Sequence, residues 1–155
     1  MSRVQLALNV ADINQAVNFY SKLFGSKPAK VRPGYANFAL TSPPLKLVLI
    51  EDATQPPGSL NHLGVEVDTV SALADEKARL LEAGLATAVE DHVTCCYALQ
   101  DKVWVKGPGD EPWEIYTVLA DAELPAEAHG AGRSDATCCA TRPDLAPAGT
   151  TPSSR

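Results

Sequence analysis

The sequence contains no apolar run close to the ~20 residues that a membrane-spanning helix requires. Its opening, Met-Ser-Arg-Val-Gln, lacks the apolar core and the small-residue cleavage site of a secretory signal peptide. Basic residues are fewer than acidic ones: 13 Lys and Arg and 19 Asp and Glu give a net charge of −6. Such a balance provides no positive surface for a nucleic-acid backbone. We therefore expect a cytoplasmic protein with neither a membrane nor a nucleic acid as partner.

Large apolar residues are almost absent after residue 121. Only Leu124 and Leu145 occur there, among Ala, Pro, Gly, Ser and Thr. Such a segment cannot bury enough surface to offset the entropy lost when a chain is ordered. We therefore expect a disordered tail over residues 122–155, and a single folded domain over residues 2–121.

The folded part contains the same order of elements twice. Residues 4–10 alternate as a half-buried strand does, and Asp12 and Gly25 are suited to the two ends of the amphipathic helix that follows. The full set of expected elements is strands at 4–10, 35–40 and 45–51, then a strand at 60–67, a helix at about 69–83, and strands at 86–93, 102–106 and 113–119.

This repetition predicts an α+β fold made of two β-α-β-β-β modules, at about residues 2–53 and 59–121. A module of ~55–60 residues is small for a core of its own, so the two sheets should join into one curved mixed sheet with the helices outside. The modules can pair within one chain or be exchanged between the two chains of a homodimer.

The repeat singles out polar residues on the strands. Asp12 lies seven residues after Gln5, and Thr69 lies seven residues after His62. When the two helix caps are aligned, Gln5 therefore corresponds to His62. Both side chains should share the polar, concave side of their strands. In the same alignment, Lys46 of the first module corresponds to Glu114 of the second.

Together Gln5, His62 and Glu114 form a nitrogen and oxygen donor set that suits a divalent transition metal. A protonated Lys46 is a poor ligand, so the expected site has three protein ligands and open positions, as non-haem Fe(II) sites do; zinc and manganese are also compatible. The alternative is structural: His62 as a hydrogen-bonded strand histidine, Gln5 as a polar edge residue and Glu114 as a solvated carboxylate.

The four cysteines occur as two adjacent pairs, Cys95–Cys96 and Cys138–Cys139, unlike a disulfide framework, which spreads cysteines along a chain. Adjacent strand residues point to opposite faces, so Cys95 and Cys96 can bind one ion only if residues 94–97 form a loop. Paired thiolates favour soft centres such as trivalent arsenic, cadmium or mercury. Two buried apolar thiols or a strained disulfide are the alternatives. Cys138 and Cys139 either capture the same ion or are an incidental pair.

The paired modules and their three polar residues resemble the vicinal oxygen chelate superfamily of glyoxalases, extradiol dioxygenases and thiol transferases. The resemblance covers residues 2 to about 121. Several motifs are similar to organoarsenical carbon–arsenic lyases and mycobacterial cadmium-induced proteins: Ser-Arg-Val-Gln-Leu-Ala-Leu-Asn-Val, Arg-Pro-Gly-Tyr-Ala-Asn-Phe-Ala, Leu-Asn-His-Leu-Gly-Val-Glu-Val, Thr-Cys-Cys-Tyr-Ala, Gln-Asp-Lys-Val-Trp-Val and Trp-Glu-Ile-Tyr-Thr-Val-Leu.

This resemblance implies an Fe(II)-dependent dioxygenase that cleaves the carbon–arsenic bond of trivalent organoarsenicals and releases arsenite. Gln5, His62 and Glu114 would then bind iron, and Cys95 and Cys96 would bind arsenic. Two other functions fit the same residues. One is sequestration of cadmium or arsenite without catalysis, and the other is a metal-dependent thiol transferase or isomerase for which the thiols are dispensable.

Overall fold

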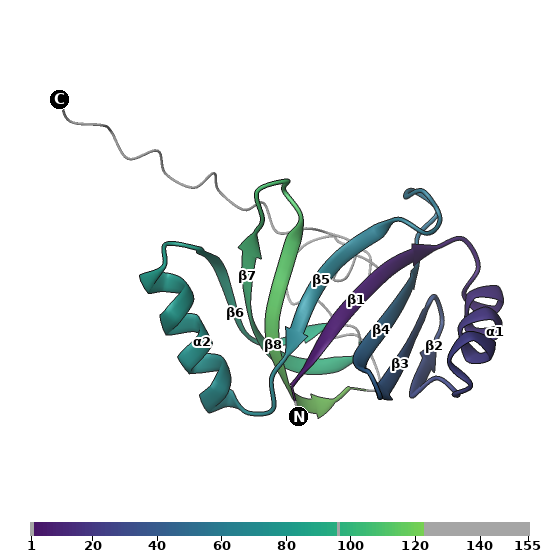
Figure 1. The fold of residues 1–155 in the computed structure, drawn as a ribbon, viewed down its shortest axis with the longest axis horizontal. Coiled ribbons are helices and arrows are strands. Elements are labelled where there is room, and N and C mark those ends of the chain that lie inside the picture. The colour runs from purple at the N-terminus through teal and green to yellow at the C-terminus, as the bar shows by residue number, and fades with distance from the viewer. Residues whose placement is uncertain (1, 96, 123–155) are drawn as a thin grey trace.

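The computed structural model describes residues 2–95 and 97–122, which form one curved eight-stranded sheet and two helices (Figure 1). Cys96 and residues 123–155, with Cys138 and Cys139, lie outside the described residues. The elements in chain order are β1 (Arg3–Val10), α1 (Ile13–Phe24), β2 (Lys30–Arg32), β3 (Tyr35–Thr41), β4 (Pro44–Glu51), β5 (Leu60–Glu66), α2 (Val70–Glu82), β6 (Ala86–Cys95), β7 (Ala98–Lys106) and β8 (Pro112–Asp121).

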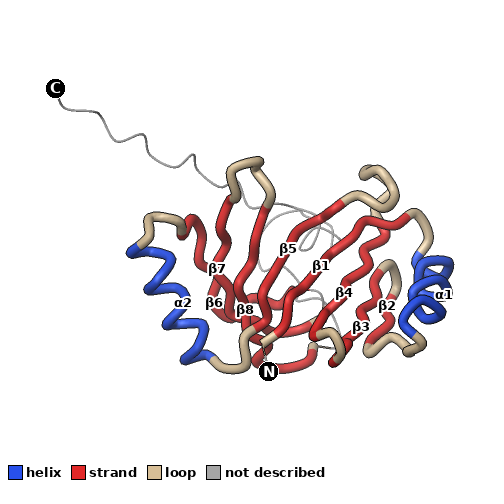
Figure 2. Tube along the Cα trace, in the orientation of Figure 1, coloured by secondary structure: helices blue, strands red, loops and turns tan. Residues whose placement is uncertain are grey.

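The strand order across the sheet is β2-β3-β4-β1-β5-β8-β7-β6. In each module the first strand pairs in parallel with the last, β1 with β4 and β5 with β8. The modules join through the antiparallel pair β1–β5, which is formed within the single chain. Figure 2 shows α1 and α2 near opposite ends of the sheet. The expected α+β fold with a curved mixed sheet is confirmed.

Helix boundaries follow from local side-chain chemistry. The carboxylate of Asp12 accepts the backbone N–H of Gln15 at 2.8 Å, and the hydroxyl of Thr69 accepts that of Ala72 at 3.1 Å. These bonds satisfy amide groups that have no partner within the helix. Helix α1 ends at Gly25, whose φ of 60° is the left-handed conformation that glycine adopts without a steric penalty.

Each helix buries an apolar stripe against one half of the sheet. Helix α1 packs on Phe38, Leu47 and Leu49 of the first module, and α2 contributes Leu73 and Leu80 to a cluster with residues of the second module. The helices therefore cover one face of the sheet. The opposite, concave face holds a row of buried polar residues at the centre of the molecule.

Two local features differ from the expectation. Strand β2 (Lys30–Arg32) is not among the expected elements; a turn at Pro33 and Gly34 lets it pair with β3. The prediction of a loop at residues 94–97 is wrong for residues 94 and 95, which belong to strand β6. Cys95 is the last residue of β6 and pairs with Ala98 of β7, so both strands extend further than expected.

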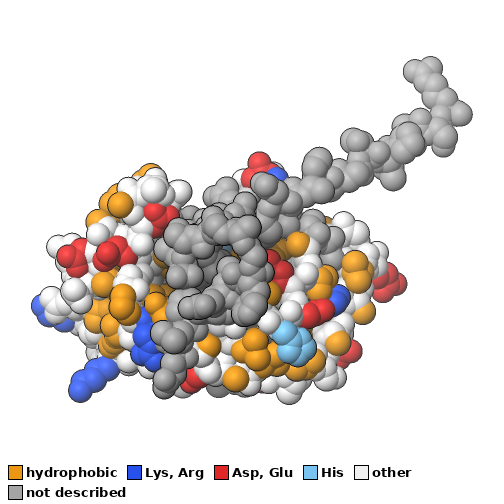
Figure 3. Space-filling view, turned by 180° about the vertical axis from the view of Figure 1, so that it is seen from behind, with side chains coloured by type: hydrophobic (Ala, Val, Ile, Leu, Met, Phe, Trp, Pro, Cys, Tyr) orange, Lys and Arg blue, Asp and Glu red, His pale blue; other side chains and the backbone are white. Residues whose placement is uncertain are grey.

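No helix among the described residues is long and apolar enough to cross a membrane. On the face drawn in Figure 3, the coloured Lys and Arg side chains stand in separate groups among apolar and acidic ones.

Candidate metal centre

The register of the sheet brings three predicted ligands from distant parts of the sequence to one place. Gln5 of β1 pairs with Gly64 of β5, and Gly64 pairs with Glu114 of β8. His62 lies two residues before Gly64, so its side chain is on the same face of β5. All three side chains are buried, with 4–6% of their surface exposed. This burial contradicts the alternative of a solvated Glu114 and an edge-strand Gln5.

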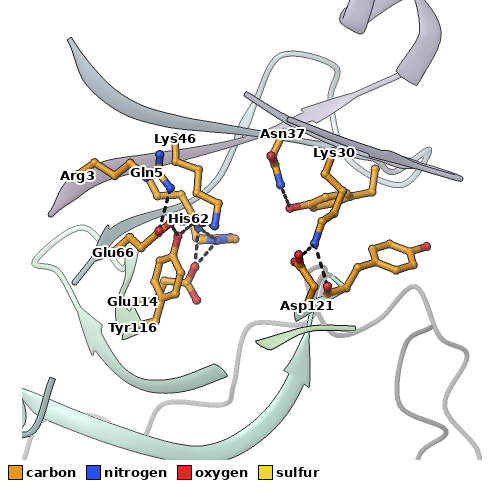
Figure 4. Close-up of polar contacts among 12 residues, drawn as sticks. Arg3, Gln5, Lys30, Asn37, Lys46, His62, Glu66, Glu114, Tyr116 and Asp121 are labelled. Carbon is orange, nitrogen blue, oxygen red and sulfur yellow. Dashed lines mark hydrogen bonds and ion pairs between the residues drawn. The ribbon is translucent and has the colours of Figure 1, made fainter. Parts of the chain in front are cut away.

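The three side chains contact one another directly (Figure 4). The Nε2 atoms of Gln5 and His62 lie 2.9 Å apart, and Gln5 Nε2 donates to Glu114 Oε1 at 2.5 Å. His62 Nε2 lies 3.1 Å from the same Glu114 oxygen. One side chain from each of three strands therefore converges on one point of the concave face.

A chain of amide side chains orients the His62 ring. His62 Nδ1 lies 2.7 Å from Asn61 Oδ1, and the Asn61 amide nitrogen donates to Asn9 Oδ1 at 2.8 Å. Because an amide oxygen only accepts, the proton of the neutral ring sits on Nδ1, and Nε2 presents its lone pair to the centre. The edge of the His62 ring also contacts Trp104, with the ring centroids 5.6 Å apart. The imidazole thus has the tautomer and the second-layer support typical of a metal ligand.

Glu114 is a buried carboxylate beside a buried cation. Burial by itself favours the neutral acid, but the ammonium of Lys102, 3.2 Å from Glu114 Oε2, lowers the pKa of Glu114 well below its usual range. Lys102 is only 3% exposed and also lies over the Trp104 ring. The carboxylate is therefore ionised at neutral pH and available to a cation.

Gly64 provides the space in which the three side chains meet. A Cβ atom at Gly64 would lie 3.0 Å from Glu114 Cγ and 3.3 Å from Gln5 Cβ, which is closer than side-chain carbons normally approach. Ala7, the pairing partner of His62, is fully buried and equally small. Small residues beside the predicted ligands thus allow strands β1, β5 and β8 to bring them together.

The donor set fits a divalent metal in number and spacing. Two ligands at right angles, each ~2.1 Å from a metal, lie ~3.0 Å apart, and the three contacts here are 2.5–3.1 Å. Among the described residues there is no cluster of three His, Cys, Asp or Glu, so the third ligand would be the Gln5 amide. Its nitrogen, not its oxygen, faces the centre here, and metal binding requires the amide to rotate.

Comparison with known protein families matches most of the chain to one superfamily. Residues 3–115 match the model of the Glyoxalase/Bleomycin resistance protein/Dioxygenase superfamily. The chain belongs to this superfamily. Among solved structures, the fold of this chain is similar to that of the Mn(II)-bound glyoxalase from Novosphingobium aromaticivorans. The TM-score is 0.56, with 18% identity over 83% of this chain and 44% of that one. Catechol 2,3-dioxygenase matches with a TM-score of 0.55 and 20% identity, over 81% of this chain and 43% of that one.

Two relatives within the superfamily are much more similar in sequence. A trivalent organoarsenical cleaving enzyme from Thermomonospora curvata is 57% identical over 142 residues, which are 92% of this chain and 91% of the relative. Cadmium-induced protein CadI from Mycobacterium tuberculosis is 63% identical over 123 residues, which are 79% of this chain and 80% of the relative. Members of the superfamily typically bind a divalent metal.

Of the predicted thiol pair, Cys95 is the last residue of β6, and Cys96 lies outside the described residues. Tyr97, the residue before β7, has a φ of 62°. The Tyr97 carbonyl accepts a bond from Lys30 of β2 at 3.1 Å, although β2 and β6 are opposite edges of the sheet. Lys30 also binds Asp121 at the end of β8 (Figure 4). The sheet therefore curls until its edges meet, and the turn next to the predicted thiols lies where they meet.

The prediction of site residues missed a second polar row beside Gln5, His62 and Glu114. Arg3, Glu66, Tyr116 and Lys102 are register partners across β1, β5, β8 and β7, two residues away from the first row. Tyr116 and Glu114 share a face because they are two residues apart in one strand, and that spacing was the available signal.

Lys46 joins this second row instead of the predicted ligands. It pairs with Gln5 in the sheet, but its ammonium lies 3.0 Å from Glu66 Oε2. The corresponding residue of the second module, Glu114, pairs with Gly64 and not with His62, so the two modules differ in register by two residues. Lys46 thus lies beside the three predicted ligands without adding a fourth donor.

Proposed function

We propose that this chain cleaves the carbon–arsenic bond of trivalent organoarsenicals such as methylarsonous acid and releases arsenite, using Fe(II) and dioxygen. The observation that carries the proposal is the buried convergence of Gln5, His62 and Glu114, which would supply three ligands to a divalent metal. The relative with 57% identity that is named for organoarsenical cleavage supports the substrate class. The reaction would serve arsenic detoxification.

His62 would hold the metal through Nε2, Glu114 through its carboxylate, and Gln5 through its amide oxygen after the amide has rotated. When bound, Fe(II) with open coordination positions supplies the binding and activation of dioxygen. Lys102 keeps the Glu114 carboxylate ionised, and the Asn61 contact places the proton of the neutral His62 ring on Nδ1, away from the centre. Both groups are therefore ready to bind a cation without first losing a proton.

Cys95 and Cys96 would bind the arsenic through their thiolates. Trivalent arsenic is thiophilic, and two thiolates adjacent in the sequence would fix the arsenic-borne carbon in place before reaction. The bond from Lys30 to the Tyr97 carbonyl supports this arrangement because it links the turn to the opposite edge of the curved sheet. In this proposal the thiols position the organoarsenical and do not themselves cleave the carbon–arsenic bond.

The test is anaerobic reconstitution with Fe(II), followed by air and methylarsonous acid, with arsenite measured by arsenic speciation. We expect arsenite release that requires added iron and is lost in His62→Ala. His92→Ala is the matched control, because His92 is an exposed histidine with 74% of its side chain accessible. Release that is independent of iron, or that survives His62→Ala, would contradict the proposal.

A second candidate function is sequestration of cadmium or arsenite by the thiols without catalysis. The 63% identity to a protein named as cadmium-induced favours this candidate. It predicts tight binding of cadmium or arsenite that depends on Cys95 and Cys96, with no arsenite formed from methylarsonous acid and no oxygen consumed. An oxygen electrode and the speciation assay, run on the same iron-loaded sample, separate the two functions.

A further inference from the structure

The hydroxyl group of Tyr116 lies between two oxygen atoms but carries only one proton. It contacts the amide oxygen of Gln5 and, at 2.9 Å, the Oε2 atom of Glu66. As the Gln5 amide is oriented here, both neighbours are acceptors, so the hydroxyl can donate to only one of them at a time. Tyr116 is completely buried, and water cannot supply the missing donor.

Glu66 is fixed as an acceptor. Its Oε1 atom lies 2.9 Å from the Arg3 guanidinium, and its Oε2 atom lies 3.0 Å from the Lys46 ammonium. Burial favours the protonated acid, but these cations and the Tyr116 hydroxyl lower the pKa of Glu66 to about 2. When the Tyr116 hydroxyl donates its proton to this carboxylate, the lone pairs of the hydroxyl oxygen can accept a hydrogen bond from Gln5.

The Gln5 amide has two orientations that differ by a half-turn of its terminal group. In the one observed, Nε2 donates to Glu114 and the oxygen faces Tyr116. After the half-turn, Nε2 donates to the Tyr116 oxygen, Tyr116 donates to Glu66, and each of these protons has an acceptor. The amide oxygen then faces His62 and Glu114 Oε1. Two acceptor oxygens at this distance repel each other unless a cation lies between them.

Resting on the metal centre proposed above, we infer that Tyr116 is a positioning residue for the metal. Its hydroxyl, which donates to Glu66, accepts the N–H of Gln5 and thereby turns the amide oxygen toward a bound divalent cation. Because a hydroxyl can both donate and accept, the same group also serves the metal-free orientation, in which it donates to Gln5. The residues Arg3, Lys46 and Glu66 act on the metal only through this hydroxyl.

The experiment is calorimetric titration of the full chain with Co(II), which needs no exclusion of oxygen and gives a visible ligand-field spectrum. Four proteins are compared: the wild type, Tyr116→Phe, Gln5→Glu and the double variant. We expect Tyr116→Phe to weaken Co(II) binding about tenfold, as loss of a supporting hydrogen bond to a ligand commonly does. In the Gln5→Glu background both ends of the ligand are oxygen, so orientation no longer matters, and the same substitution should cost less than about threefold.

Tyr35→Phe is the matched control, because it removes another buried tyrosine hydroxyl, which accepts a bond from Asn37. It should bind Co(II) as the wild type does. Equal losses from Tyr116→Phe in both backgrounds, no loss in either, or a similar loss in Tyr35→Phe would overturn the inference while leaving the metal centre intact. If the wild type binds no divalent cation, the proposed centre fails and this inference fails with it.

Discussion

Substitution of Gly64 by alanine tests whether close packing of three strands sets the spacing of the predicted metal ligands. The new Cβ atom would lie 3.0 Å from Glu114 Cγ, 3.2 Å from the Glu114 carbonyl oxygen and 3.3 Å from Gln5 Cβ. Ordinary carbon contacts are ~3.5–4.0 Å, so these neighbours must move by a few tenths of an ångström. The carbonyl oxygen belongs to the paired backbone of β8, so it cannot move without disturbing the β5–β8 ladder.

We expect two effects of Gly64→Ala. Overpacking in the sheet should lower the free energy of unfolding by about 1–3 kcal/mol. Separation of Gln5 from Glu114 should weaken Co(II) binding by at least about tenfold, because metal–ligand distances tolerate changes of only ~0.2 Å. Urea unfolding followed by circular dichroism measures the first effect, and calorimetric titration measures the second.

Gly109→Ala is the control for a general cost of alanine in place of glycine. Its Cβ atom would approach only the carboxylate of Glu111, a flexible side chain that can turn away. This variant should keep wild-type stability and Co(II) affinity. If Gly64→Ala also binds Co(II) as tightly as the wild type, ligand spacing does not depend on this glycine, and the packing argument for the centre is refuted.

Three further predictions address the thiols, the charge network and the fold. Cys95→Ser or Cys96→Ser should abolish binding of methylarsonous acid but leave Co(II) affinity unchanged, and undiminished turnover in either variant would exclude the thiol role. The folded-state pKa of Glu66, about 2, lies below its ordinary value of 4.5. Its ionised form therefore stabilises the fold above about pH 4.5, and this contribution is lost as the pH falls toward 2. Glu66→Gln should thus cost up to roughly 3 kcal/mol of unfolding free energy at pH 7 and almost nothing near pH 2, a difference that urea titrations at the two pH values measure. Asp12→Ala removes the cap of α1 and should cost about 1 kcal/mol of stability without changing Co(II) affinity; a change in affinity would show that the two regions are coupled.

The fold was predictable because its signals are local. Alternation in residues 4–10 and helix caps at Asp12 and Thr69 depend on neighbours within a few residues, and both appear in the structure as expected. The short strand β2 was not expected, because its pairing depends on a turn at Gly34 and not on its own three residues. The end of β6 at Cys95 was missed for a similar reason, since the pairing of Cys95 with Ala98 extends both strands of the hairpin.

The second polar row of the concave face depends on information that one strand does not contain. The contact between Tyr116 and Gln5 joins residues 111 positions apart, and that between Lys102 and Glu114 depends on how β7 and β8 are aligned. A shift of one residue would move either side chain to the opposite face of the sheet. The repeat could align equivalent strands of the two modules, but it carried no information on the pairing between neighbouring strands.

The choice of glutamine at position 5 has an electrostatic reason in this setting. Glu114 is already ionised in the centre, and a carboxylate in place of Gln5 would stand within hydrogen-bond distance of it. Buried like charges at this distance repel strongly in the absence of a cation. A neutral amide avoids that repulsion and leaves a donor set with one negative charge, the same charge as in the two-histidine, one-carboxylate sites of non-haem Fe(II) oxygenases. The cost of the amide is that only one of its ends can bind a metal, and the Tyr116 hydroxyl next to it is the group placed to select that end.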